Sequence, residues 1–259
     1  MAWLRAARSL RASADADGRV SCTTKFVCLP EVTPFMYLLS AAAAVAMTAA
    51  FLVESSSWWI KGACPPGMVG LYVSRSNIYL YFGRFFALAY NALIAFGIEN
   101  GATARQVSGT LAIGFGAAFL AHLVMLSGGR ATRVTMTMLG RILLLPHQQW
   151  NVAPAAIPRN KSIVLATATA SLCFGLGISL PLLLAVFVPQ YRMSLSYVGQ
   201  TVNALGTILL LFMVDQRLFR SLDEGSLLND LPSYSLGRAA AFGTAGVICA
   251  LIYGSSING

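Results

Sequence analysis

Long apolar stretches, separated by short polar or proline-containing breaks, make up most of the chain after residue 32. The first of them, PFMYLLSAAAAVAMTAAFLV, contains no charged residue and is followed by Glu54. A helix needs about 20 predominantly apolar residues to cross a membrane. The pattern therefore predicts six membrane spans. Their approximate bounds are 34–53, 70–98, 107–126, 163–188, 198–214 and 237–253.

The segment between the third and fourth spans has a different pattern. From Ser127 to Ser162 it contains five basic residues and no acidic residue. Its middle part, residues 134–145, alternates apolar and small polar residues and is too short to cross a membrane. We expect a helix there that lies in the membrane interface and ends at Pro146.

Residues 1–32 are polar and basic, and they lack the apolar core of a secretory signal peptide. We expect a disordered N-terminal extension over 1–32 and a six-span membrane domain over 33–259. The composition agrees, because 57% of the 259 residues are hydrophobic and 10% are charged. Ordinary soluble domains have about 45–50% apolar and about 25% charged residues. The predicted fold is an all-α, polytopic membrane bundle with about six transmembrane helices and one interfacial helix.

The net charge of +9 favours contact with membrane lipids rather than nucleic acid, since basic loops of membrane proteins face anionic headgroups and the cytoplasm. The loops after spans two and four, with their flanking span ends, hold only Arg105 and Arg192. The other basic residues outside the extension, apart from Arg84 and Arg238, belong to the loops after spans one, three and five. This distribution places both chain ends outside the cytoplasm, unless the basic extension overrules the loops.

The sequence lacks the motifs of several functional classes. The five cysteines form no CxxC pair and have no histidine at ligand spacing, so neither a disulfide framework nor a zinc site is indicated. The motifs of common hydrolases and ATPases are also missing. We expect no metal and no cofactor, and transport would draw on a gradient, on substrate supply or on a partner.

Arg84 is the most informative charged residue, because it lies inside the second span. A centrally placed arginine costs at least about 2.5–3.5 kcal/mol to insert unless it finds a partner or water. Its guanidinium could bind phosphate in a hydrated cavity. Alternatively, it could form a structural ion pair with Glu54 or Glu99.

A second polar group follows the first span, in the sequence ESSSWWIK. Its three serines could satisfy helical carbonyls or face a polar cavity. Trp58 and Trp59 are typical of anchors at a membrane interface. Glu54 and Lys61 could belong to a site or could be solvated at the end of the span.

The third polar group spans the end of span five and the start of span six. Asp215 and Asp223 are eight residues apart, close to one face of a continuing helix that could hold Arg238 across the loop. Asn203, one turn before Thr207, could bind a ligand or join helices. His122 lies on an apolar helix, where a hydrogen-bonded core residue is more common than a proton relay.

Several segments together resemble the Amj family of lipid II flippases, six-span membrane proteins that serve as an alternative to MurJ. The resemblance extends over most of residues 35–253, and its segments come in the family's order. They are ESSSWWIK (54–61), NIYLYFGRFFALAYN (77–91), RNKS (159–162), VPQYRMS (188–194), VNALGTILLLFMVD (202–215), LFRSLDEG (218–225) and LGRAAAFGTAGVICALIY (236–253). The chain departs from the family at Gln216, where family members carry proline, and in its extension.

The resemblance implies a flippase of the bacterial cytoplasmic membrane that carries lipid II for cell-wall synthesis, with cell-wall synthesis proteins as possible partners. The residues carried over to substrate binding are Arg84, Lys61, Arg238 and Asn203. Those carried over to gating or ion pairing are Glu54, Asp215, Asp223 and Thr207.

Two alternatives remain open at this point. Glu54, Ser55, His122 and Arg84 could form an intramembrane phosphatase site for polyprenyl diphosphates. A non-catalytic scaffold of a cell-envelope complex would instead depend on small-residue faces such as Ala239 and Gly243.

Overall fold

The computed structural model describes residues 32–146 and 160–255. Pro34–Gly259 forms one compact unit, which contains all six predicted spans. The predicted extension and its predicted disorder lie outside the described residues, except for Val32.

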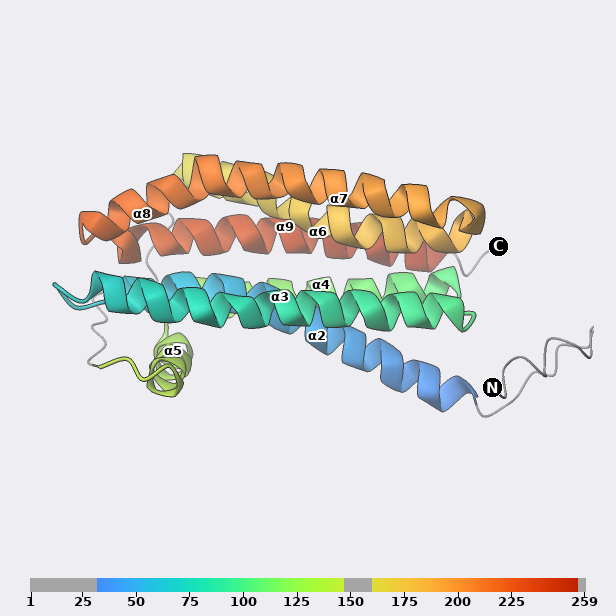
Figure 1. Cartoon of the computed structure of the whole chain (residues 1–259), viewed down its shortest axis with the longest axis horizontal. Helices are drawn as coiled ribbons and strands as arrows, with labels where there is room; N and C mark the ends of the chain where they lie inside the picture. Colours follow the sequence, from blue (N-terminus) through green and yellow to red (C-terminus); the bar gives the residue numbers. More distant parts are fainter. Residues whose placement is uncertain (1–31, 147–159, 256–259) are drawn as a thin grey trace, which may run out of the picture. The chain divides into compact units, whose positions relative to one another are not determined.

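The described part of the chain is helical and contains no strand (Figure 1). The helices are α2 (Val32–Gly62), α3 (Val69–Glu99), α4 (Ala104–Leu126), α5 (Arg130–Ile142), α6 (Lys161–Phe187), α7 (Arg192–Leu209), α8 (Gln216–Asp223) and α9 (Leu227–Ser255). A 3-10 turn over Pro189–Tyr191 precedes α7, and a π-helical segment over Leu210–Asp215 joins α7 to α8. Six helical stretches are long and apolar enough to cross a membrane, with Pro189–Asp223 counted as one. The predicted all-α, multi-pass fold is therefore confirmed.

Three helices extend well beyond the predicted spans. α2 continues past Glu54 to Gly62, the fifth stretch reaches Asp223, and α9 begins at Leu227 rather than near residue 237. The predicted spans stopped where charged or polar residues begin. In the structure several of those residues turn into the bundle, where other helices supply their partners, so the helices do not need to end there.

The long helices form two layers, with α2, α3 and α4 in one and α6, α7 and α9 in the other (Figure 1). On one side the layers are joined closely, because α9 packs against α4 as well as against α6 of its own layer. Aromatic rings fill the interior between the layers. The ring of Phe51 on α2 lies 4.3 Å from that of Phe242 on α9 and 5.9 Å from that of Phe115 on α4, centroid to centroid.

Glycines bring α6 very close to its neighbours. A Cβ atom on Gly206 of α7 would lie 2.8 Å from the backbone nitrogen of Phe174, and one on Gly237 of α9 would lie 2.6 Å from the carbonyl oxygen of Val164. Such close approach is typical of helix packing in membranes, where small residues let backbones meet. Helices α6, α7 and α9 therefore form a tight subassembly.

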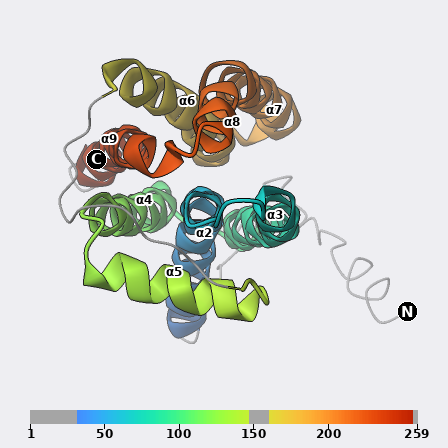
Figure 2. The ribbon, with the colours of Figure 1, turned by 90° about the vertical axis from the view of Figure 1, so that its left-hand side faces the viewer.

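The short helix α5 lies across the long helices at one end of the bundle (Figures 1 and 2). It begins and ends a few residues before the predicted bounds of 134–145. Thr132, Met136 and Gly140 are buried, whereas Val134, Met138 and Ile142 form an exposed apolar stripe. This arrangement is that of an amphipathic helix, the pattern typical of helices that lie in a membrane interface.

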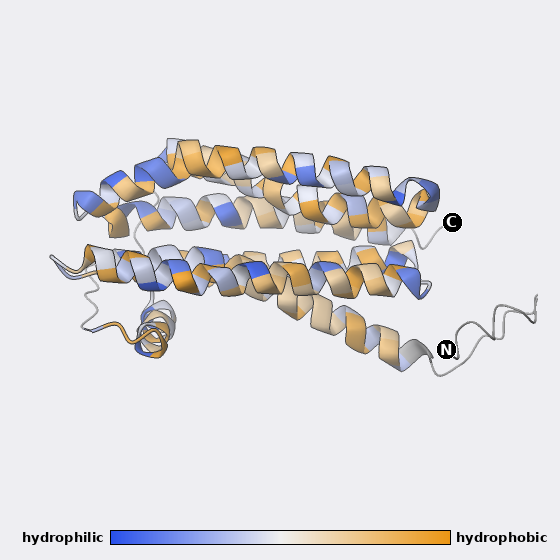
Figure 3. Ribbon diagram, in the orientation of Figure 1, coloured by the Kyte–Doolittle hydropathy of each residue, from blue (hydrophilic) through white to orange (hydrophobic). Residues whose placement is uncertain are grey.

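We call the two ends of the bundle the α5 end and the opposite end. The α5 end holds the turns after α2, α4 and α8, and hydrophilic positions gather at the helix ends (Figure 3). This end also holds the basic residues of the loops after spans one, three and five, as far as the structure describes them. The opposite end carries Glu99, Arg105 and Arg192.

Candidate functional site

A cavity of about 530 Å³ lies between the two layers, on the side away from the α4–α9 contact. Helices α2, α3, α6, α7 and α8 and the π-helical segment line it. Six of the eight site residues selected from the sequence belong to its lining. They are Glu54, Lys61, Arg84, Asn203, Thr207 and Asp215.

The cavity opens sideways on the surface of the bundle. Arg84 on α3 is exposed, and so are Thr207 on α7 and Phe219 on α8, yet all three line the cavity. Leu211, in the π-helical segment between α7 and α8, lines it too and is 52% exposed. A molecule inside the cavity can therefore extend into the surrounding lipid between α3 and α7.

Lys61 forms the deep basic wall of the cavity and is only 2% exposed. Its Nζ lies 4.1 Å from the ring centroid of Trp58 and 5.4 Å from that of Phe219. Asp215 is close enough to interact with Lys61 electrostatically. The aromatic rings, and the attraction to Asp215, compensate part of the cost of burying the ammonium.

The two tryptophans do not act as interface anchors, and that prediction was wrong. Trp58 is 5% exposed and lines the cavity, and Trp59 is 1% exposed and donates from Nε1 to the Ser235 hydroxyl at 3.1 Å. Because α2 continues as a helix through this sequence, both indoles point into the bundle rather than to its surface.

Arg84 sits near the middle of α3, at the depth expected for an intramembrane charge. Within the described ranges it forms no ion pair, and its guanidinium carbon lies 5.7 Å from the ring centroid of Tyr81. Neither predicted partner is available, because Glu54 pairs with another arginine and Glu99 lies four helical turns away on the same helix. The guanidinium therefore keeps its donors for a ligand or for water.

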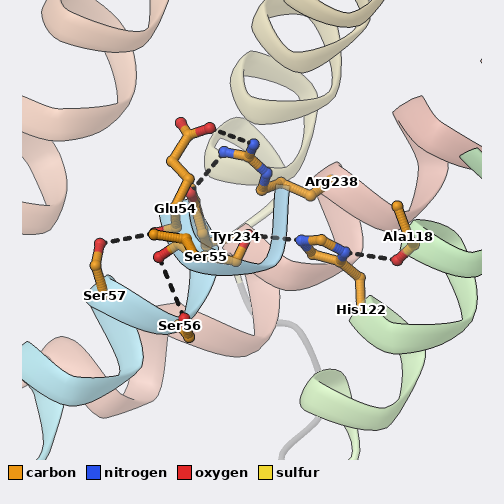
Figure 4. Close-up of polar contacts among 9 residues, drawn as sticks. Glu54, Ser55, Ser56, Ser57, Ala118, His122, Tyr234 and Arg238 are labelled. Atoms are coloured by element: carbon orange, nitrogen blue, oxygen red, sulfur yellow. Dashed lines mark hydrogen bonds and ion pairs between the residues drawn. The ribbon is translucent and has the colours of Figure 1, made fainter. Parts of the chain in front are cut away.

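Arg238 is fully buried behind the cavity and does not line it. Its Nη2 donates to Oε2 of Glu54 at 2.6 Å, and its Nη1 donates to the hydroxyl of Tyr234 at 2.8 Å (Figure 4). The predicted attachment of Arg238 to a face with Asp215 and Asp223 is thus replaced by an ion pair with α2. Arg238 reaches the cavity only through Glu54, whose side chain is 26% exposed.

Ser55 and His122 form a second buried contact beside this ion pair (Figure 4). The ring nitrogen Nδ1 of His122 lies 2.7 Å from the carbonyl oxygen of Ala118, and Nε2 lies 2.5 Å from Oγ of Ser55. A carbonyl only accepts, so Nδ1 carries the proton, and in the neutral ring Nε2 accepts from the serine. His122 is fully buried. The prediction of a hydrogen-bonded core histidine is confirmed.

The three serines of α2 mainly satisfy groups within the bundle. Ser57 donates to the carbonyl oxygen of Glu54 at 2.7 Å (Figure 4). Ser56 donates to the carbonyl oxygen of Val53 and contacts the hydroxyl of Tyr79. All three are buried and none lines the cavity. The first of the two predicted serine roles, satisfying carbonyls, is the one that the structure shows.

The π-helical segment sets the direction of Asp215. Asp215 follows Thr207 by eight residues, which in a regular α-helix would turn it about 80° away from that side chain. A π turn contains one more residue than an α turn, so the extra residue offsets this rotation about the helix axis by about 100°. Asp215 is thereby placed on the same face as Thr207 and Asn203, and all three line the cavity.

Asp223 is not brought to the site, and the predicted common face with Asp215 was wrong, because eight residues of regular α-helix turn a side chain by about 80°. It is exposed at the end of α8, and it is absent from the residues that line the cavity. The lining also includes Tyr90, which the sequence places near Arg84, and residues that sequence reasoning missed, among them Asn77 and Phe219. Asn77 lies within the same segment as Arg84 in the sequence, so the polar residues around that arginine were the available signal.

The residues of the phosphatase alternative and of the scaffold alternative lie in different parts of the bundle. Of the four phosphatase candidates, Glu54 and Arg84 line the cavity, whereas Ser55 and His122 are buried outside it. The small-residue face of the scaffold alternative packs inside the bundle, since Ala239 is 1% exposed and a Cβ on Gly243 would lie 3.2 Å from Phe119 of α4. Among the described residues there is no group of His, Cys, Asp or Glu side chains that could hold a metal ion.

Comparison with known proteins adds no relative, since no family model, no curated protein and no solved structure matches the chain.

Proposed function

We propose that the chain is a flippase that moves a polyprenyl-diphosphate-linked peptidoglycan precursor of the lipid II type from the cytoplasmic to the outer leaflet of the bacterial cytoplasmic membrane. The observation that carries the proposal is the cavity between α3 and α7. It combines two cations, Lys61 and Arg84, with a sideways opening towards lipid. A lipid-linked diphosphate needs both features, because its headgroup must leave water-like surroundings while its tail stays in the bilayer.

Arg84 and Lys61 are the groups that bind the diphosphate. The planar guanidinium of Arg84 has no carboxylate partner in the described structure, so it can donate two parallel hydrogen bonds to phosphate oxygens. Lys61 adds a point charge at the deep end, and Asn203 and Thr207 add neutral polar groups between them. Arg238 supports the site by fixing Glu54.

Asp215 and Glu54 balance these cations when the cavity holds no substrate. A diphosphate that enters takes over Lys61 from Asp215, and the carboxylates then exchange partners among Lys61, Arg84 and Arg238 as the cavity alternates sides. Such an exchange requires two arrangements that differ by only a few kcal/mol. The role is supported by the electrostatic attraction of Asp215 to Lys61 and Arg238 and by its repulsion from Glu54.

The position of the cavity fits loading from the cytoplasm. Lys61, Asp215 and Phe219 lie towards the α5 end, where the basic loops gather. Basic loops mark the cytoplasmic side of membrane proteins. The site therefore faces the leaflet in which the precursor would be made.

The test is transport by the purified full-length protein in proteoliposomes. A fluorescent lipid II analogue is added, and the fraction reaching the opposite leaflet is measured by its accessibility to a membrane-impermeant quencher. We expect Arg84→Ala to lower the initial rate at least tenfold, since charge-assisted hydrogen bonds contribute about 1.5–3 kcal/mol each. Arg75→Ala is the matched control, because Arg75 is exposed on the same helix but does not line the cavity.

Wild-type rates in liposomes no higher than in protein-free liposomes would overturn the proposal. Complementation of a bacterium depleted of its own flippases gives the same test in cells, scored by precursor accessible on the outer face. Release of inorganic phosphate from a polyprenyl diphosphate by the purified protein would instead favour the phosphatase alternative.

A further inference from the structure

A second cavity, also of about 530 Å³, continues the first towards the opposite end of the bundle. It lies between the second halves of α3 and α6 and the first half of α7, and Ile178 and Asn203 line both cavities. Its volume falls in the range of small-molecule sites, about 300–1,000 Å³. Together the two cavities form one groove that follows α3 and α7 across most of the bundle.

One face of α7 supplies polar groups along this groove. The residues recur at helical spacing, and they are Arg192, Ser196, Gln200, Asn203 and Thr207. Side chains three to four residues apart lie on the same face of a helix. The stripe therefore runs from the opposite end to the first cavity without a break.

The second cavity is lined by amides rather than by buried cations. Asn91 on α3 and Gln200 and Asn203 on α7 supply them, whereas Glu99 and Arg192 are exposed side chains near the ends of their helices. The side-chain oxygen of Asn203 is buried and has no hydrogen-bond partner in the structure. A buried acceptor without a partner is costly, and it marks a place where a donor from a ligand would be stabilising.

Backbone geometry leaves one carbonyl of α6 without its usual partner. Pro181 in α6 has no N–H, so the carbonyl of Gly177, four residues earlier, lacks the usual helical hydrogen bond, and its oxygen faces Gly199 of α7, where a Cβ would come within 2.6 Å of it. Gly177 and Pro181 line the second cavity, beside the apolar side chains of Ile178 and Leu182. The wall thus combines amide groups with an apolar face.

We infer that the second cavity is a binding site for an uncharged, hydroxyl-bearing headgroup of the saccharide type. Amides both donate and accept, which matches the two roles of a sugar hydroxyl, and the apolar wall suits the C–H face of a pyranose ring. A diphosphate would instead bind to Lys61 and Arg84 in the first cavity. This inference rests on the proposed function, and it assigns the diphosphate and the saccharide of one lipid to successive parts of the groove.

The test compares farnesyl diphosphate with N-acetylglucosaminyl diphosphoryl farnesol, which differ in the sugar and in the one ionisable phosphate oxygen that the sugar esterifies. Binding to the purified full-length protein in detergent is followed by tryptophan fluorescence, since Trp58 lines the first cavity. We expect the wild type to bind the sugar-bearing lipid about tenfold more tightly, as two or three neutral hydrogen bonds would provide. Gln200→Leu should lower this ratio to about threefold, because Asn91 and Asn203 keep their hydrogen bonds, and it should change the Kd of farnesyl diphosphate less than twofold.

Thr201→Leu is the matched control. Thr201 is exposed beside Gln200 on α7, its hydroxyl donates to the carbonyl of Tyr197, and it lines neither cavity. It should keep the tenfold ratio. Three outcomes would overturn the second site alone. They are a ratio of Kd values near one in the wild type, an unchanged ratio in Gln200→Leu, and equally weakened binding of both lipids in Gln200→Leu. If neither lipid binds the wild type, the proposed function fails as well.

Discussion

Glu54 and Arg238 join the two layers of the bundle through an ion pair of 2.6 Å, although 184 positions separate them in the sequence. Arg238 is fully buried, and Glu54 lies at the cavity wall. A buried arginine without its carboxylate is left with an uncompensated charge. The pair therefore stabilises the fold in addition to shaping the site.

Removal of one partner should be more harmful than removal of both. We expect Glu54→Met to lower the free energy of unfolding in mixed detergent micelles by about 3 kcal/mol, because it leaves Arg238 buried and unpaired. The double variant Glu54→Met with Arg238→Met should recover part of this loss, since no lone charge remains. Strictly additive effects of the two substitutions would show that the pair is not coupled.

The glycine at the α6–α7 contact should not tolerate even a methyl group. In Gly206→Ala the new Cβ would lie 2.8 Å from a backbone nitrogen, which cannot move as a flexible side chain can. We expect a loss of about 1–3 kcal/mol in the free energy of unfolding. Gly116→Ala is the control on α4, where nothing lies within 4 Å, and it should gain roughly 0.5–1 kcal/mol from helix propensity.

The π-helical segment should be removable by deletion of one residue. Phe212 lies in it and is 65% exposed. Its deletion turns the segment into regular α-helix while Asp215 keeps its direction, so binding of farnesyl diphosphate should stay within about twofold of the wild type. Deletion of the exposed Val198 in regular helix should abolish binding, because it shifts Gly206 away from α6. Equal loss in both deletions would contradict this account.

Two aspartates of equal charge should differ in their effect on binding. Asp215→Asn removes a negative charge from the cavity wall, so farnesyl diphosphate should bind about fivefold more tightly, corresponding to about 1 kcal/mol. Asp223→Asn makes the same change at an exposed position outside the cavity and should leave the Kd unchanged. Weaker binding by Asp215→Asn would show that this carboxylate supports the ligand directly.

Labelling of Cys64 tests the orientation of the chain in the membrane and the ionisation of the Cys64 thiol. It lies between α2 and α3 at the α5 end, and partial burial raises the pKa of its thiol above the ordinary value. Only the thiolate reacts with maleimide, so in a chain with no other cysteine its labelling should be slow at neutral pH and still rise above about pH 9. A cysteine placed at the exposed Glu224 should label faster at neutral pH. An impermeant maleimide should reach both only from the cytoplasmic side.

Hydropathy alone predicts the number of long apolar helices correctly, because each apolar run reaches at least the lower limit of about 17 residues that a bilayer requires. It fails at Glu54 and at the start of α9, because it treats a charge as the end of a span. A charge that finds its partner on another helix costs little inside the bundle, and the sequence contains no sign of which helix that is. The same limit explains the wrong prediction for Trp58 and Trp59.

The candidate site could be predicted in part. Arg84 stands out in the sequence because a lone charge inside an apolar run has few explanations. The direction of Asp215 could not be predicted, since it depends on one π turn within the apolar sequence LLFMVD. Nor could the second cavity, because Asn91, Gln200 and Pro181 come from three helices and form no motif in the sequence.

The α4–α9 contact and the Glu54–Arg238 pair lie on the same side of the groove, away from its opening between α3 and α7. Separating the layers at that contact would expose a fully buried guanidinium, whereas α3 and α7 meet only across the cavities. α3 also packs against α6 across the layers, so a wider groove would require that contact to open while the α4–α9 contact stays closed. Under the proposed function, the largest headgroup that passes would be set by this opening rather than by the volume of either cavity at rest.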